Sequence, residues 1–194
     1  MVKRTSIAVV AGCLSFVAVA WGAGSVTLRL GRSQVGGVSS SRETARGTVR
    51  VTPARHWRFV RYARPGPSKA EYSIAVSGAS CLPEGELWVV GVQATAADPR
   101  VVVREHASMG VLAAGRLHAG AWAVVRYRTA PSATQPLLGA VAAIRVAPRR
   151  LLTVQARLRS SCSLSTAQLR QIAAELGASA RSVRPHVRIA KGPA

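Results

Sequence analysis

The sequence predicts a mainly β extracytoplasmic domain, a β-sandwich or a small barrel-like fold, with one short C-terminal helix and a transmembrane helix before it. Three observations support this prediction: an uncharged apolar leader, a series of short β-branched runs broken by Pro and Gly, and one amphipathic stretch near the C-terminus. The hydrophobic content of 48% is typical of a globular domain, and an aromatic content of only 5% leaves Val, Ala and Leu to fill the core.

The first element is an apolar leader behind a short basic end. Lys3 and Arg4 are followed by no charged residue until Arg29. About 20 apolar residues suffice for a helix to cross the hydrocarbon core of a bilayer. We therefore expect a cytoplasmic N-terminus over residues 1–5 and a transmembrane signal-anchor over residues 6–28, with the rest of the chain outside the cytoplasm.

A cleaved signal peptide is the alternative interpretation of the leader. The segment Ala18-Val-Ala20 supplies a small-x-small cleavage site, after which the product would be secreted. The apolar run continues past Ala20 through Trp21, Val26 and Leu28, which exceeds a normal signal core. The sequence therefore favours the uncleaved anchor and a single-pass protein of the cell membrane.

Composition divides the rest of the chain into three parts. Residues 29–46 are rich in Gly and Ser and predict a tether. Residues 47–177 form the expected β-rich extracytoplasmic domain. Residues 178–194 carry basic residues without acids and predict a flexible tail.

Strand-like runs follow one another through the domain, and most either alternate apolar with polar residues or are apolar on both faces. Turn signals containing Pro, Gly or Asp separate them. The expected strands are Glu71–Ser77, Leu87–Val92, Val101–Val103, Gly110–Ala114, Ala121–Tyr127, Leu138–Val146 and Leu152–Leu158.

One helix is expected after these strands. The stretch Thr166–Leu176 repeats apolar residues at helical spacing, Ser165 can cap its N-terminus, and Gly177 is the expected stop.

Two cysteines lie in the exported part, Cys81 and Cys162. Conditions outside the cytoplasm oxidise thiols, so we expect a disulfide bond between them. A catalytic thiol, and with it an envelope thiol enzyme, is the less favoured alternative because no Cys/His signature surrounds either residue.

The charge balance bears on partners. The chain holds 27 basic and 7 acidic residues; without Lys3 and Arg4, the exported part carries +18, which is 25 minus 7. Such a domain should be attracted to anionic lipid or to an anionic wall polymer, or dock on an acidic protein partner. Nucleic acid is rarely encountered in that compartment and is not expected as the ligand.

One segment mixes arginines with aromatic rings and is the candidate contact surface for an anionic ligand or a membrane. A strand whose rings enter the core, with its arginines outside, is the alternative. The candidate residues are Arg55, Trp57, Arg58, Phe59, Arg61, Tyr62 and Arg64.

Patterns for catalysis or metal binding are weak. His106, Met109 and His118 have a spacing that matches no strong metal site, so no metal or cofactor is expected. Hydrolase, metalloprotease and Walker motifs are missing from the sequence, and no catalytic residue is assigned. We therefore expect a non-enzymatic binding or scaffolding protein of a bacterial envelope, or, if the leader is cleaved, a secreted inhibitor or wall-binding factor.

Overall fold

The computed structural model describes residues 24–36, 43–62, 69–107, 110–127, 138–160 and 163–191. Residues 6–23 of the signal-anchor predicted over residues 6–28, and the predicted cleavage site at Ala20, lie outside this part of the chain. Within it, no helix has both the length and the apolar character needed to cross a bilayer.

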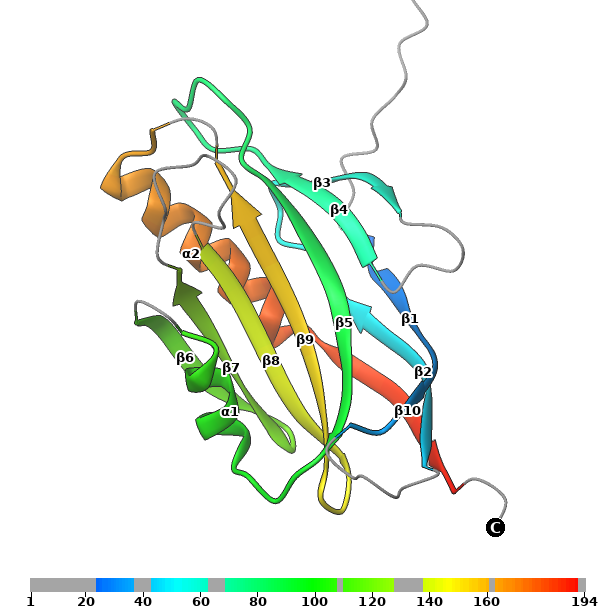
Figure 1. Cartoon of the computed structure of the whole chain (residues 1–194). Coiled ribbons are helices and arrows are strands. Elements are labelled where there is room, and N and C mark those ends of the chain that lie inside the picture. The colour runs from blue at the N-terminus through cyan, green and yellow to red at the C-terminus, as the bar shows by residue number, and fades with distance from the viewer. Residues whose placement is uncertain are drawn as a thin grey trace, which may run out of the picture.

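Two antiparallel sheets form the molecule (Figure 1). The larger has seven strands, and each is hydrogen-bonded to its neighbours in the order β3-β4-β5-β9-β8-β7-β6. In that order the strands are β3 (Trp57–Tyr62), β4 (Lys69–Ile74), β5 (Glu84–Ala94), β9 (Arg150–Arg159), β8 (Leu138–Ala147), β7 (Gly120–Arg126) and β6 (Val111–Leu117). The predicted mainly β, sandwich-like fold is confirmed.

The smaller sheet has three strands in the order β1-β2-β10: β1 (Val26–Gln34), β2 (Thr44–Val51) and β10 (Arg184–Ala190). Its first and last strands come from opposite ends of the described chain. A short parallel bridge between Gly36 and Gln93 joins the segment after β1 to β5.

The small sheet and helix α2 (Thr166–Arg181) cover the same face of the large sheet, while helix α1 (Pro99–Glu105) packs on β7 and β8 from the opposite face. In Figure 1, α1 lies in front of the large sheet and α2 behind it. The main core fills the space between the layers. Its fully buried side chains include Leu28, Val49, Tyr72, Ile74, Leu152, Leu158, Ile172 and Leu176.

Helix α2 begins as predicted but ends later. The Ser165 hydroxyl accepts a hydrogen bond from the Gln168 amide, and the Gln168 side chain accepts one from the Ser165 amide, which completes a capping box. The predicted stop at Gly177 is wrong, because the helix continues to Arg181. Gly177 lies buried against Trp122, so its missing side chain serves close packing.

The segment Val101–Val103 is helical, which corrects the predicted strand. The carboxylate of Asp98 accepts a hydrogen bond from the Arg100 amide (2.8 Å), and Pro99 occupies the first turn, where its missing N–H costs nothing. Val102 and Val103 are buried and form the packed side of this helix, whereas Val101 is exposed.

Three predicted boundaries are also corrected. Residues 26–28 belong to strand β1 rather than to a membrane helix, and much of the expected tether over residues 29–46 forms β1 and the start of β2. The expected flexible tail over residues 178–194 contains the last turn of α2 and strand β10. Strand β10 pairs with β2, which lies more than 130 residues earlier in the chain, and a local pattern does not show such a partner.

Candidate anion-binding surface

The small sheet turns one face to the core and the other to solvent. The inward face buries Leu28, Val49 and Val51, with Val187 and Ile189 packed at its margin. The outward face is polar and strongly basic, and we call it the arginine face. It consists of Thr27, Arg29, Arg46, Thr48, Arg50, Arg184, His186 and Arg188.

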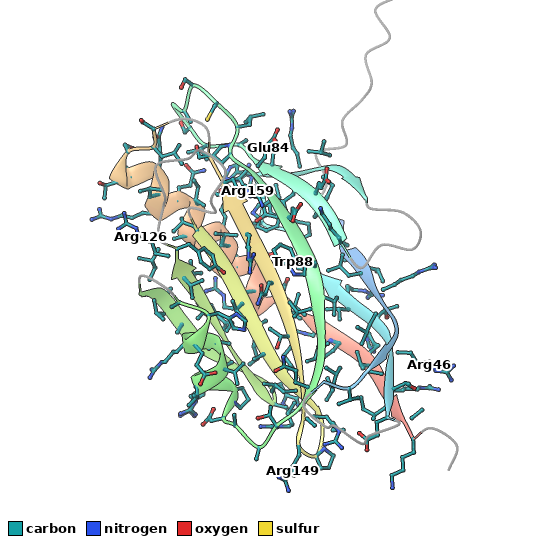
Figure 2. All side chains as sticks on the ribbon, viewed as in Figure 1. Arg46, Glu84, Trp88, Arg126, Arg149 and Arg159 are labelled. Carbon is teal, nitrogen blue, oxygen red and sulfur yellow. The ribbon has the colours of Figure 1, made fainter. Side chains whose placement is uncertain are left out.

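Strand register places arginines of the arginine face directly opposite one another. Arg50 pairs with Arg184, and Arg46 pairs with Arg188. Neighbouring strands lie about 4.8 Å apart, and like charges directly opposite destabilise a sheet. An anion between the guanidinium groups would relieve that repulsion. Figure 2 shows Arg46 on the solvent side of the small sheet, pointing away from the large sheet.

The acidic residues of the chain do not neutralise this face. All seven lie in the described part and none belongs to the arginine face, although Glu43 directly precedes β2: Glu43, Glu71, Glu84, Glu86, Asp98, Glu105 and Glu175. Lys69 pairs with Glu71 and Glu86. Glu43 accepts a hydrogen bond from Arg150 (2.6 Å), which holds the pKa of the Glu43 carboxyl below its ordinary value.

A cleft of 680 Å³ continues the arginine face between β10, the end of α2 and the turns between β6 and β7. None of its lining residues is acidic. Its basic lining consists of Arg50, Arg116, His118, Arg145, Arg181, Arg184 and His186.

Some of these arginines have structural partners. Arg145 donates to the carbonyls of Thr95 and Ala97, both at 2.6 Å, and thereby fixes the segment that leads to α1. Arg184 donates to the carbonyl of Arg181 (3.0 Å) at the C-terminal end of α2. These contacts hold the cleft in shape.

The arginine face and its cleft suit binding. A guanidinium group stays charged at all relevant pH values and can donate two parallel hydrogen bonds to a phosphate or carboxylate. The face carries no carboxylates, and its hydroxyl and imidazole residues Thr48 and His186 lie opposite each other across the strands. The arrangement can therefore hold repeated negative charges.

Two rings of the predicted contact segment Arg55–Arg64, those of Trp57 and Phe59, pack into the core. Trp57 is 3% exposed and stacks on Tyr72, with the ring centroids 3.9 Å apart, and Phe59 packs against the same core. A bulge after Phe59 leaves Val60 exposed. Trp57 is thus unavailable as a surface contact. For this residue the alternative interpretation, a strand whose rings enter the core, is correct.

The other members of that segment divide as follows. Arg55 is exposed and Arg58 is half-buried in β3. The side chains of Arg61 and Tyr62, and the whole of Arg64, lie outside the description.

Cys81 lies in the loop before β5, with its sulfur 3.8 Å from the hydroxyl oxygen of Ser160. Cys162 follows Ser160 by two residues but lies outside the described part, so the Cys81–Cys162 disulfide stays a prediction.

Two of the three candidate metal residues, His106 and His118, lie in the described part, and each has other neighbours. The ring nitrogen Nδ1 of His106 is 2.9 Å from Nε2 of Gln155, His118 lines the basic cleft, and Met109 is not described. Across the described ranges, no three His, Cys, Asp or Glu side chains are grouped as metal ligands would be.

Sequence reasoning missed a pair formed by His56 and Glu175. Nδ1 of His56 lies 2.6 Å from Oε1 of Glu175, and Gln171 donates to the same oxygen (3.1 Å). Gln171 also donates to the carbonyl of Ala75 (3.3 Å). No hydrogen bond from His56 to a hydroxyl or thiol is found among the described residues. The pair ties the β2–β3 connection to α2.

The sequence did not predict the arginine face either, although the strands that form it show a recognisable alternation of polar and apolar residues. In Arg184-Pro-His-Val-Arg-Ile189, polar and apolar residues alternate as in a half-buried strand. Val26-Thr-Leu-Arg-Leu30 alternates in the same way, but it follows directly on the apolar leader.

Comparison with known proteins shows no relationship: no family model, no curated protein and no solved structure matches this chain.

Proposed function

We propose that this chain is an exported, non-enzymatic binding protein of a bacterial envelope whose arginine face holds a polyanion. The observation that carries the proposal is the pair of opposed arginines on β2 and β10, Arg50 with Arg184 and Arg46 with Arg188, on a face without acids. A single small anion would neutralise one opposed pair at a time. A polymer with repeated phosphate or carboxylate groups would satisfy both pairs along the strands.

The position of β1 supports release of the protein rather than anchoring. Val26 and Leu28, which extend the apolar run in the sequence, are 3% and 0% exposed within the core of the domain. Strand β1 begins at Val26, so the predicted anchor over residues 6–28 loses its last three residues to the domain, and five residues separate the predicted cleavage site after Ala20 from the strand. We therefore favour a mature protein that starts at Trp21 and stays in the envelope through its charge; the signal-anchored form is the second candidate.

The proposal is tested by binding to polyphosphate, with two variants that change net charge equally. The double variant Arg46→Ser/Arg188→Ser removes two arginines of the arginine face. The control Arg100→Ser/Arg104→Ser removes two exposed arginines of α1. At roughly 1 kcal/mol for each basic residue near an anionic surface, we expect about thirtyfold weaker binding for the first variant. The control should bind almost as the parent does.

The salt dependence gives a second readout. The slope of log affinity against log salt should be shallower for Arg46→Ser/Arg188→Ser than for the parent, because fewer counterions are released. Equal losses in both double variants would mean that net charge alone drives binding, and would refute the proposed site. Vesicles with anionic lipid, run in parallel, distinguish headgroups from polymer.

A further inference from the structure

A second concave region lies on the other side of α2, between the helix and the β6–β7–β8 edge of the large sheet. We call it the α2 groove, and its volume is 580 Å³. Volumes of this size are typical of sites for small molecules, which are mostly apolar with a few polar groups. Its apolar lining consists of Leu112, Ala113, Trp122, Leu138, Leu169, Ala173, Ala174 and Gly177.

Two glycines fix the indole of Trp122 in the groove. A Cβ at Gly115, its cross-strand partner on β6, would lie 2.7 Å from Nε1 of Trp122, and one at Gly177 would lie 3.2 Å from Cζ3. Glycine inside a helix costs about 1 kcal/mol relative to alanine. Here it lets α2 approach the sheet closely, so that Trp122 closes the inner end of the groove.

Three arginines, Arg126, Arg170 and Arg181, stand around the groove, and no acidic residue lines it. All three are exposed. Arg126 ends β7 beside the N-terminal half of α2 (Figure 2), the half that also carries Arg170. The guanidinium of Arg181 lies 5.0 Å above the Trp122 ring at the other end.

We propose that the α2 groove binds a long-chain fatty acid, with its carboxylate at Arg126 and Arg170 and its hydrocarbon chain along Leu169, Ala173 and Trp122. The distance along α2 from Arg170 to Arg181 is about 16 Å at 1.5 Å per residue, so most of an extended palmitate chain would lie beside the helix. The apolar lining and the cationic rim match the two parts of such a ligand.

A peptide fits the groove less well. An extended peptide would need hydrogen-bond partners for its backbone, and the apolar lining offers almost none. An acyl chain has no polar groups beyond its head and needs no such partners.

The fatty-acid site is separate from the arginine face, and only Arg181 borders both the groove and the basic cleft. Loss of one binding activity therefore need not affect the other.

Photo-crosslinking of the full chain tests the proposal. The probe is a palmitate analogue with a diazirine in its chain, and the control probe has the same chain with a trimethylammonium head. We expect the carboxylate probe to label peptides of α2 and β6–β8. The double variant Arg126→Gln/Arg170→Gln should reduce labelling about tenfold, because it removes two charge-assisted hydrogen bonds. The control Arg100→Gln/Arg159→Gln, with the same change of charge at exposed sites, should label as the parent does.

A variant that blocks the α2 groove tests whether the hydrocarbon chain of the ligand lies there. Ala174 is exposed on α2, so Ala174→Trp should fill the groove, leave circular dichroism unchanged and abolish labelling. If that variant does not fold, Leu112→Glu at the half-exposed rim should abolish labelling by repelling the carboxylate. Equal labelling by the cationic probe, labelling confined to other peptides, or unchanged labelling of a folded blocking variant would overturn the proposal. Competition by an acidic amphipathic peptide at a lower concentration than palmitate would also overturn it.

Discussion

His106 is held in its neutral form by the residue that it contacts. The amide nitrogen of Gln155, which is 4% exposed, can only donate a hydrogen bond, so Nδ1 of His106, 2.9 Å away, must accept it. Burial lowers the pKa of His106 below its ordinary value, and the positive charge of Arg157 lowers it further. Protonation of this ring would break the hydrogen bond and add charge beside Arg157.

This arrangement makes stability depend on pH. The native state binds fewer protons than the unfolded chain below about pH 6.5, the ordinary pKa of histidine. The free energy of unfolding should therefore fall as the pH drops from 7.5 to 5.5, until the lowered native pKa is reached. Urea titrations at several pH values should show a weaker decline for His106→Gln than for the parent. His118→Gln, at the exposed turn between β6 and β7, is the control and should retain the parental slope. A parental slope in His106→Gln would contradict this prediction.

At the scale of the element, β2 holds the small sheet together because it lies between β1 and β10. Gly47 stands at its centre with φ of 153°, opposite Leu30 on one side and Val187 on the other. A Cβ at Gly47 would lie 2.1 Å from the carbonyl oxygen of His186. A side chain there would separate β2 from β10 and disturb the arginine face.

We therefore expect Gly47→Ala to lower the free energy of unfolding by about 2–4 kcal/mol, the range of strained or overpacked positions. The same variant should bind polyphosphate more weakly. In the control Gly36→Ala, the nearest atom would be 3.7 Å from the new Cβ, an ordinary contact, and stability should change by less than about 0.5 kcal/mol. Urea unfolding measures both, and equal stability of the two variants would count against a close contact at Gly47.

At the scale of the whole molecule, a bond between Cys81 and Cys162 would tie the loop before β5 to the start of α2. In the chain-entropy model, closing a loop of about 80 residues stabilises the fold by roughly 4.5 kcal/mol. The exported protein should resist alkylation of these thiols until it is reduced, and Cys162→Ser should lower its melting temperature. Cys13→Ser should leave the melting temperature unchanged. Alkylation of both thiols in the unreduced native protein would contradict the bond and favour the thiol-enzyme alternative.

The local sequence determined much of this fold. Strands such as Leu138–Val146 and Leu152–Leu158, and the start of α2 at Ser165, follow from side-chain periodicity and from a cap whose partners lie three residues apart. The excess of basic residues likewise predicted an anionic partner, but it did not show where that partner would bind.

Only the tertiary structure decided where the candidate sites lie. Arg46 and Arg188 are 142 residues apart in the chain and become opposed through the pairing of β2 with β10, just as Gly115 and Gly177 meet at Trp122 through packing of α2 on the sheet. Backbone hydrogen bonds between strands join residues regardless of their separation, so no short window of sequence contains both partners. The composition thus determined that the net charge is positive, and strand pairing determined that arginines gather on one face of the small sheet.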